Sequence, residues 1–395
     1  MTNKVQMRIG IDIRLIGKNE TGSEVYFFNL VKNLATVDRN NEYFLYTDRD
    51  PEKDANLKKE TEKLRLGDNF KIIVINSPNR FWWNLWALPN HLRKNPVDIF
   101  HTQYIAPFWL PKKVGLVLTI HDISFNFFPE YIKKSDLFFL KTLIPRSIRR
   151  ADKIITVSAS EKENIADFYH IPPEKIEFTH NGADLERFGR DFSNEEMEVV
   201  RKKYNLPASA DTSAGKPEKF LLYIGTLQPR KNIPAVIEAL GYLDEKFVIA
   251  GNRNARNFDR RIDEAIKKYD LQDRVIFPGW IDEGDKPILY KLAAVFVFPS
   301  LYEGFGIPIV EAMAAGIPVI ASDIPVHREI AGSAALFCNP KDGSEFAGNI
   351  SKIFVNENLR RDLAEKGKIA AQNFTWQKTA KKTLGIYNKN LLDIL

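Results

Sequence analysis

Two glutamates, Glu303 and Glu311, flank a segment of the chain that contains two glycines and a proline. An apolar run at 295–299 predicts a buried strand before them, and Pro308 favours the first turn of a helix after the loop. Backbone N–H groups and the helix dipole at such a strand-to-helix turn attract phosphate, and carboxylates accept hydrogen bonds from sugar and ribose hydroxyls. The segment therefore predicts a site for a phosphorylated sugar, with Gly304, Phe305 and Gly306 letting the ligand approach the main chain. The alternative is a solvated loop glutamate and a glutamate at a helix start.

A second candidate site follows the expected strand at 220–225, where Arg230 and Lys231 open a helix. Two cations at a helix N-terminus oppose the dipole, so their presence there favours an anionic ligand such as a diphosphate. Arginine offers a forked donor and lysine a mobile charge, and together they stabilise the negative charge of a leaving group. The alternative is an exposed basic helix start.

Three further features follow expected strands in the first half of the chain. His121 and Asp122 lie at the end of a strand at 116–120, where a polar pair indicates a site, although a lone histidine often only satisfies loop carbonyls. Gly22 lies in a strand-to-helix loop without the dinucleotide fingerprint, and it either approaches a ligand or serves a plain turn. The D-x-D sequence at 48–50 runs into Pro51 and is interpreted as a solvated turn, so no metal site is predicted.

The elements that must position these residues alternate between short apolar runs and longer amphipathic stretches, which indicates parallel sheets covered by helices. Strands are expected at 8–13, 43–46, 71–75, 98–101, 116–121 and 153–157, and again at 220–225, 247–251, 275–278, 295–299 and 318–321. The fold class is α/β, with two Rossmann-like doubly wound domains facing a central cleft. The expected division is a first Rossmann-like domain at 1–187, a linker at 188–217, a second Rossmann-like domain at 218–375, and a C-terminal helix at 376–395 that crosses back to the first domain.

Composition excludes several classes of protein. The 395 residues suit two domains, and the single cysteine, Cys338, excludes an internal disulfide framework and a cysteine-based zinc site. A formal charge of +6 suits an anionic ligand or membrane surface but is mild for a nucleic-acid binder. No signal peptide or apolar run of membrane-spanning length is evident, so the expected location is cytoplasmic, at the inner face of the membrane.

The spacing Glu303-x7-Glu311, with Gly-Phe-Gly-Ile-Pro between, resembles the E-x7-E motif of family 4 glycosyltransferases with the GT-B fold. The resemblance covers nearly the whole chain. It also includes Gly10-Ile-Asp-Ile-Arg14, His121-Asp122, Thr156-Val-Ser158, His180-Asn-Gly-Ala-Asp184 and Gly225-Thr-Leu-Gln-Pro-Arg-Lys-Asn232. One position departs from many relatives, which have arginine where this chain has Thr226. That difference places more of the diphosphate binding on Arg230 and Lys231.

The resemblance implies that Glu311 binds the donor ribose, that Glu303 binds the transferring sugar, and that His121 contacts that sugar near its reacting carbon. It implies a retaining hexosyltransferase without a metal or other cofactor, whose co-substrate is a nucleotide diphosphate sugar, with GDP-mannose favoured. The acceptor is expected to be a glycan or a polyprenyl-linked glycan in surface polysaccharide assembly, and nucleic acid is not a partner. The alternatives are a sugar-nucleotide epimerase of related fold and an inactive nucleotide-sugar-binding scaffold.

The segment at 79–94 is unusually aromatic, and Phe138 and Phe139 add to it. Such residues suit a lipid-linked acceptor or a membrane interface, which would give the protein a peripheral membrane association. Packing in the core of the first domain is the favoured interpretation.

Overall fold

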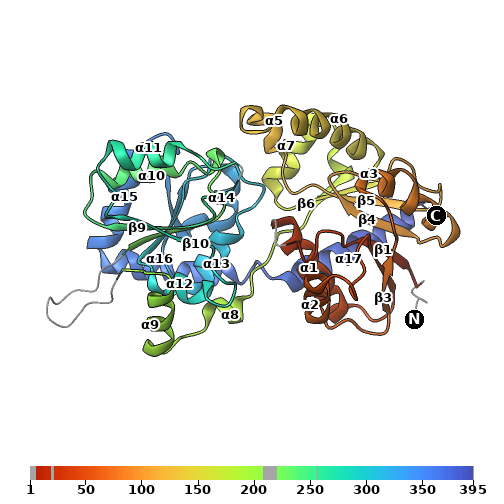
Figure 1. Cartoon of the computed structure of the whole chain (residues 1–395), viewed down its shortest axis with the longest axis horizontal. Helices are drawn as coiled ribbons and strands as arrows, with labels where there is room; N and C mark the ends of the chain where they lie inside the picture. The colour runs from red at the N-terminus through yellow and green to blue at the C-terminus, as the bar shows by residue number, and fades with distance from the viewer. Residues whose placement is uncertain (1–5, 19–21, 208–219, 256, 395) are drawn as a thin grey trace. The chain divides into compact units, whose positions relative to one another are not determined.

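The computed structural model describes residues 6–18, 22–207, 220–255 and 257–394 (Figure 1). The chain forms two compact units. Unit 1 comprises Met1–Phe127, Ile132–Asn181 and Trp376–Leu395, and unit 2 comprises Phe128–Tyr131 and Gly182–Thr375.

The sheet of unit 1 has seven parallel strands in the order β3-β2-β1-β4-β5-β6-β7. The strands are β1 (Arg8–Asp12), β2 (Glu42–Thr47), β3 (Phe70–Val74), β4 (Ile99–Gln103), β5 (Gly115–Thr119), β6 (Lys153–Thr156) and β7 (Ile176–Phe178). Ile9 of β1 is in register with Tyr43 on one side and with Ile99 on the other. Strand order therefore reverses between β1 and β4, which is the position where doubly wound sheets bind ligands.

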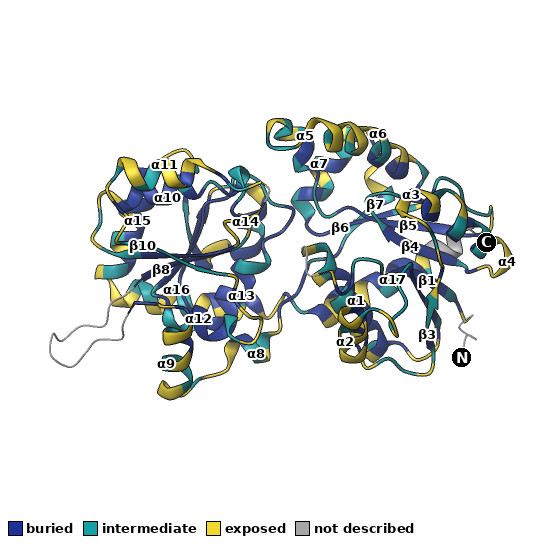
Figure 2. Ribbon diagram, viewed as in Figure 1, coloured by how far each residue is buried: buried dark blue, intermediate teal, exposed yellow. Residues whose placement is uncertain are grey.

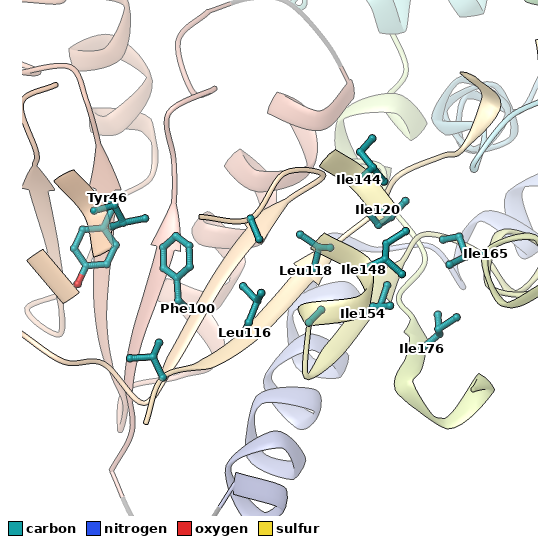
Figure 3. Packing of buried hydrophobic residues seen from close by; sticks show 14 of the residues in the cluster. Tyr46, Phe100, Leu116, Leu118, Ile120, Ile144, Ile148, Ile154, Ile165 and Ile176 are labelled. Carbon is teal, nitrogen blue, oxygen red and sulfur yellow. The ribbon is translucent and has the colours of Figure 1, made fainter. Parts of the chain in front are cut away.

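Helices cover both faces of this sheet because its central strands are apolar on both sides. They are α1 (Gly22–Val37), α2 (Ala55–Lys63), α3 (Arg80–Trp82), the π-helical η1 (Trp83–Ala87), α4 (Leu88–Lys94), α5 (Ser124–Phe127), α6 (Lys134–Arg150), α7 (Ala159–Tyr169), the 3-10 turn η3 (Pro173–Lys175) and α17 (Trp376–Ile394). Figure 3 shows part of one core layer, in which Leu118 and Ile154 of the sheet pack near Ile148 of α6.

The sheet of unit 2 has six parallel strands in the order β10-β9-β8-β11-β12-β13. The strands are β8 (Phe220–Ile224), β9 (Lys246–Ala250), β10 (Val275–Gly279), β11 (Val295–Phe298), β12 (Val319–Ser322) and β13 (Ala335–Cys338). Its helices are α8 (Leu185–Gly189), α9 (Asn194–Lys203), α10 (Ile233–Leu240), α11 (Arg261–Lys268), α12 (Lys286–Leu292), α13 (Ile307–Ala315), α14 (Pro325–Ala331), α15 (Gly343–Val355) and α16 (Glu357–Ala371), with the 3-10 turns η2 (Pro129–Tyr131), η4 (Pro229–Lys231) and η5 (Gly332–Ala334). Most strand residues are buried (Figure 2). Here the order reverses between β8 and β11.

Helix α17 belongs to unit 1, where it packs against α1 and β5. Its Tyr387 hydroxyl lies 2.6 Å from Nδ1 of His101, and Nε2 of His101 lies 2.7 Å from the Thr119 hydroxyl. His101 is fully buried, and burial lowers the pKa of its imidazole to about 3. A neutral histidine in this chain of hydrogen bonds therefore fixes the last helix against the sheet.

The division of the chain differs from the expected linker at 188–217. Unit 2 begins at Gly182, and α8 and α9 are part of it. Lys203 at the end of α9 forms 2.6 Å ion pairs with Asp282 and Asp285, because the basic last turn of α9 meets the acidic segment that precedes α12. The small-residue segment at 208–217 lies outside the described residues.

Candidate active site

The main candidate site of unit 2 lies where β8 and β11 end side by side at the reversal of strand order. The segment after β8 contains η4, and the segment after β11 leads into α13. Leu301 donates its backbone N–H to the carbonyl of Arg230 at 2.9 Å, which joins the two segments directly. Residues that are about 70 positions apart in the sequence therefore share one edge of the sheet.

In the loop from β11 to α13, Gly304, Phe305 and Gly306 are buried. Gly306 has a φ of +147°, a conformation that side chains disfavour, and it immediately precedes α13. Phe305 packs edge-on against Phe374, with ring centroids 5.7 Å apart. Pro308 lies in the first turn of α13, and no side chain caps this helix. The loop therefore brings its main chain to the sheet edge with a fixed conformation.

Glu303 is the centre of a buried ion cluster in this loop. Its carboxylate accepts a hydrogen bond from Nη1 of Arg230 at 3.1 Å and a second from Nζ of Lys231. Burial on its own would raise the pKa of Glu303, but Lys231 and Arg230 outweigh it and lower that pKa to about 2. The three side chains are 10–18% exposed. At neutral pH the cluster is one anion held by two cations, a net positive site.

The backbone before α10 explains why both cations face the loop. Arg230 and Lys231 lie in the 3-10 turn η4 rather than at the start of α10, because Asn232 adopts a left-handed conformation with φ of +56°. The Asn232 side chain donates to the carbonyls of Pro299 and Pro340 at 3.2 and 2.6 Å. The exposed basic helix start considered from the sequence is therefore wrong, since Lys231 is 9% exposed.

Glu311 lies within α13 and has partners of its own. Its Oε2 accepts a 2.9 Å hydrogen bond from the Tyr290 hydroxyl of α12. Burial raises the pKa of Glu311, Lys286 opposes that rise, and the nearby Glu283 adds to it. Glu283 in turn pairs with Lys286 at 2.5 Å and with Arg187 at 3.5 Å. Glu311 is therefore a buried acceptor that gains from any further hydrogen-bond donor.

The sequence interpretation did not find Tyr290, Lys286 or Arg187. The sequence signal that could have indicated two of them is the spacing of Lys286 and Tyr290, which lie four residues apart on a short helix. It also did not find His327, which is fully buried beside Phe298 with ring centroids 5.4 Å apart. Nδ1 of His327 donates to the carbonyl of Ser322 at 2.9 Å, and burial lowers its pKa to about 4. It therefore packs as a neutral side chain behind the cluster.

Unit 1 holds the other predicted residues, and the environment there is aromatic. His121 lies two residues beyond β5, where its Nε2 is 2.9 Å from Oε1 of Gln103. The rings of Tyr26 and Tyr104 lie 4.9 and 5.6 Å from its own. Burial outweighs the nearby Asp122 and lowers the pKa of His121 to about 4. His121 is thus neutral at physiological pH, and since its Nε2 donates to Oε1 of Gln103, its Nδ1 is the hydrogen-bond acceptor.

Asp122 and Gly22 have local roles that the structure makes plain. The Asp122 carboxylate accepts from the backbone N–H and the hydroxyl of Ser124 at 3.0 and 2.6 Å, so it fixes the first turn of α5. Gly22 is the first residue of α1 and is exposed, and an added Cβ would meet no atom within 4 Å. Neither observation bears on a ligand.

The D-x-D sequence at 48–50 runs into a turn, as expected from the sequence, but it is less solvated than expected. All three residues are half-buried. Arg49 pairs with Asp54 at 2.7 Å and donates to the carbonyl of Arg14 at 3.1 Å, so it links β2, α2 and the end of β1. Among the described residues, no group of three or more histidine, cysteine, aspartate or glutamate side chains is placed to hold a metal ion.

Comparison with known families matches the two halves of the chain separately. Residues 21–187 match the family described as Glycosyltransferase Family 4. Residues 208–370 match the family described as Glycosyl transferases group 1. The first match covers most of unit 1, and the second covers the cluster of Glu303, Arg230 and Lys231 together with Glu311.

Two curated relatives are mannosyltransferases. The chain is 29% identical over 287 residues to O-antigen chain mannosyltransferase B of Escherichia coli, which is 71% of this chain and 72% of that one. It is 29% identical over 245 residues to O-antigen chain mannosyltransferase RfbU of Salmonella typhimurium, and the match spans 62% of each chain. The match therefore covers less than two thirds of the Salmonella protein.

A solved structure shows the same fold. Anabaena Alr3699/HepE in complex with UDP-glucose superimposes with a TM-score of 0.73 at 17% identity, over 97% of this chain and all of that one. In the part of the chain that the structure describes, every helix is too short or too polar to cross a bilayer.

Proposed function

The chain belongs to the family 4 glycosyltransferases of the GT-B fold, and from this premise we propose that it is a retaining mannosyltransferase. It transfers mannose from GDP-mannose to a glycan or a polyprenyl-linked glycan during surface polysaccharide assembly. The two O-antigen mannosyltransferases among its relatives support the sugar and the process. The choice of guanine as the donor base rests on the family resemblance rather than on the geometry of the site. Anabaena HepE, which has the same fold, is in complex with UDP-glucose.

The observation that carries the proposal is the cluster of Arg230, Lys231 and Glu303 at the end of β8 and β11. The two cations meet at one carboxylate there, and cations at a sheet edge favour an anionic ligand such as a diphosphate. Lys231 and Arg230 neutralise the negative charge that develops on the leaving nucleotide, and the N-terminus of α13 adds its dipole. Glu303 remains ionised at neutral pH and accepts hydrogen bonds from hydroxyls of the transferring sugar.

Glu311 is the proposed partner of the donor ribose. Glu311 is 9% exposed, and its carboxylate accepts a hydrogen bond from the Tyr290 hydroxyl at 2.9 Å. The two ribose hydroxyls supply further donors to a buried acceptor whose pKa burial already raises. Ribose binding therefore stabilises the ionised form of Glu311.

In unit 1, neutral His121 is the proposed contact to the transferring sugar near its reacting carbon. A neutral imidazole hydrogen-bonds to hydroxyls without placing a second positive charge near a developing oxocarbenium ion. Asp122 acts through the loop geometry that it fixes, and the main chain at Gly22 approaches the donor.

The proposed reaction keeps the configuration of the anomeric carbon. The acceptor hydroxyl oxygen bonds to that carbon on the face from which the nucleotide diphosphate leaves. The bond between the carbon and the diphosphate oxygen breaks, and the acceptor proton passes to the leaving phosphate. No second carboxylate of the glycosidase kind is needed, because the leaving group acts as the base.

Incubation with GDP-mannose and with UDP-, ADP- and dTDP-sugars, with and without acceptor glycan, tests the proposal. Acceptor-dependent release of GDP and an α-linked product by NMR are expected. A sugar altered on its nucleotide without acceptor would instead show an epimerase. Binding without any turnover would show a scaffold, and a β-linked product would contradict retention.

A further inference from the structure

Seven large aromatic side chains of unit 1 are exposed, although such residues are usually buried where no partner covers them. They are Phe81, Trp82, Trp86, Phe127, Phe138, Phe139 and Phe168, with exposures from 44% to 67%. Among the described residues of unit 2, only Tyr242 and Trp280 are comparable. Core packing, the interpretation favoured from the sequence for the segment at 79–94, therefore holds for Trp83, Leu88 and Leu92. It is wrong for Phe81, Trp82 and Trp86.

Five of these side chains lie on elements that contact one another. The Phe81 ring of α3 lies 5.5 Å from that of Phe108, and the guanidinium of Arg146 on α6 lies 5.9 Å from the same ring. Arg150, one turn further along α6, donates to the carbonyl of Pro107. Trp109 donates its indole N–H to the carbonyl of Leu85 in η1 at 3.0 Å. The strand-connecting segment near Phe108 thus joins α3 and η1 to α6 in one surface.

Helix α6 has large apolar side chains on its outer side as well as on its inner side. Its inner side packs through Ile144 and Ile148, which are fully buried. Its outer side presents Phe138 and Phe139, 67% and 54% exposed, beside the exposed Lys141. Figure 2 shows exposed residues along the outer side of α6. A helix on a water-exposed surface usually has polar residues on its outer side. Exposed aromatic rings on that side are typical of a helix that lies in a membrane interface.

The positive charge of the chain is concentrated in the same region. Residues 79–150 contain eleven lysines and arginines but four aspartates and glutamates, an excess of seven, whereas the whole chain has an excess of six. The remainder of the chain is therefore slightly acidic. A surface that combines exposed aromatic rings with lysine and arginine complements a bilayer with anionic headgroups, where rings enter the interface and cations meet phosphates.

We propose that α3, η1 and α6 form the surface by which the protein binds an anionic lipid bilayer. This aromatic–basic surface comprises Phe81, Trp82, Trp86, Phe138, Phe139, Lys141 and Arg146. Binding is peripheral, since its apolar elements are short amphipathic helices that lie in the plane of the headgroups. The inference rests on the lipid-linked acceptor of the proposed function, but it is independent of the donor base and of the stereochemistry.

Co-sedimentation with lipid vesicles tests the proposal. Vesicles containing phosphatidylglycerol should bind the wild-type protein, and phosphatidylcholine vesicles should not. The double variant Phe138→Ser/Phe139→Ser should lose at least about tenfold in binding, because two rings no longer enter the interface. Lys141→Glu/Arg146→Glu should lose a comparable amount on anionic vesicles, and binding of the wild type should weaken with added salt.

The matched control is Val355→Ser/Ile369→Ser in unit 2, where two apolar side chains are 81% and 72% exposed. It should bind vesicles as the wild type does, and thermal unfolding checks that each variant is folded. Equal binding to both vesicle types, or wild-type binding by both double variants of α6, overturns the proposal. So does a Phe138/Phe139 variant that still binds vesicles and loses only transfer to a lipid-linked acceptor, since those residues would then form an acceptor site.

Acceptor-dependent GDP release with a water-soluble glycan separates this inference from the proposed function. If release is normal and vesicle binding is absent, only the membrane surface is wrong. If anionic vesicles bind the protein and no donor is turned over, the membrane surface stands and the proposed function is wrong.

Discussion

The two units share a doubly wound topology but place different chemistry at the carboxyl ends of their strands. In unit 2, Glu303 is ionised and paired with two cations. In unit 1, His121 is neutral and surrounded by aromatic rings. The difference teaches that strand order fixes where a ligand binds, whereas the side chains after each strand decide what it is. One edge carries paired charges, and the other carries a neutral imidazole among aromatic rings.

The largest effect is expected from Lys231→Met and, separately, from Arg230→Met. In the proposed function each removes a preorganised donor to the leaving diphosphate, and such a loss typically costs on the order of 3 kcal/mol, roughly a hundredfold or more in rate. Steady-state transfer assays measure this loss. Lys267→Met and Arg260→Met, at exposed positions in and beside α11, are matched controls that should keep wild-type rates. Full activity in the Lys231 and Arg230 variants would remove the charged cluster from the reaction.

The His121→Ala variant tests the edge of unit 1 in the same way. Turnover should fall by about two orders of magnitude while donor affinity changes little, because the proposed contact is realised near the reacting carbon. Separate determination of kcat and of the donor Kd distinguishes the two effects. Wild-type turnover would contradict the placement of His121, and an equal loss in both quantities would indicate a purely structural role.

The acid stability of unit 2 should depend on Glu303. Its pKa is lowered to about 2 from an ordinary value of 4.5, so its stabilising effect is complete above pH 4.5 and is lost as the pH falls toward 2. The shift corresponds to about 3 kcal/mol at neutral pH. Urea unfolding at several pH values should show a smaller fall between pH 5 and pH 3 in Glu303→Gln than in the wild type. Identical slopes would contradict the buried ion cluster.

Glu311→Ala should weaken donor binding by about 1 to 3 kcal/mol, since it removes the acceptor proposed for the ribose hydroxyls. Because the pKa of Glu311 is raised, donor affinity of the wild type should also decline as the pH falls toward that pKa and Glu311 takes up a proton. Calorimetric titrations at two pH values measure both effects. Glu365→Ala, at an exposed position on α16, is the control.

The smallest effect is expected from Gly22→Ala. Gly22 is exposed and an added Cβ meets nothing, so the free energy of unfolding should change by less than about 0.5 kcal/mol. A modest rise in the KM for the donor would then indicate that the donor lies close to the main chain at Gly22. An unchanged KM would leave Gly22 as a plain helix start.

The sequence predicted eleven of the thirteen strands found in the described residues, because buried parallel strands are continuous apolar runs. It missed β7 (Ile176–Phe178) and β13 (Ala335–Cys338), which are short strands at the edges of their sheets. The candidate residues at the sheet edges were predicted from motifs, since the carboxyl ends of strands are where ligands bind.

The partners of those residues could not be predicted in the same way. The pairs Lys231–Glu303 and Tyr290–Glu311 join residues 72 and 21 positions apart, and only the packing of β8, β11 and α12 brings them together. The left-handed Asn232, which turns both cations toward Glu303, leaves no signature in composition or periodicity. Local patterns thus predict elements, and tertiary packing decides pairing.

Isothermal titration with GDP tests the central claim, that the charged edge of unit 2 holds the nucleotide diphosphate, most directly. The account predicts that GDP binds the wild type and the His121→Ala variant with nearly equal affinity. It predicts weaker binding by Glu311→Ala and by Lys231→Met. Equal GDP affinity in all four proteins, or a loss confined to His121→Ala, would contradict it.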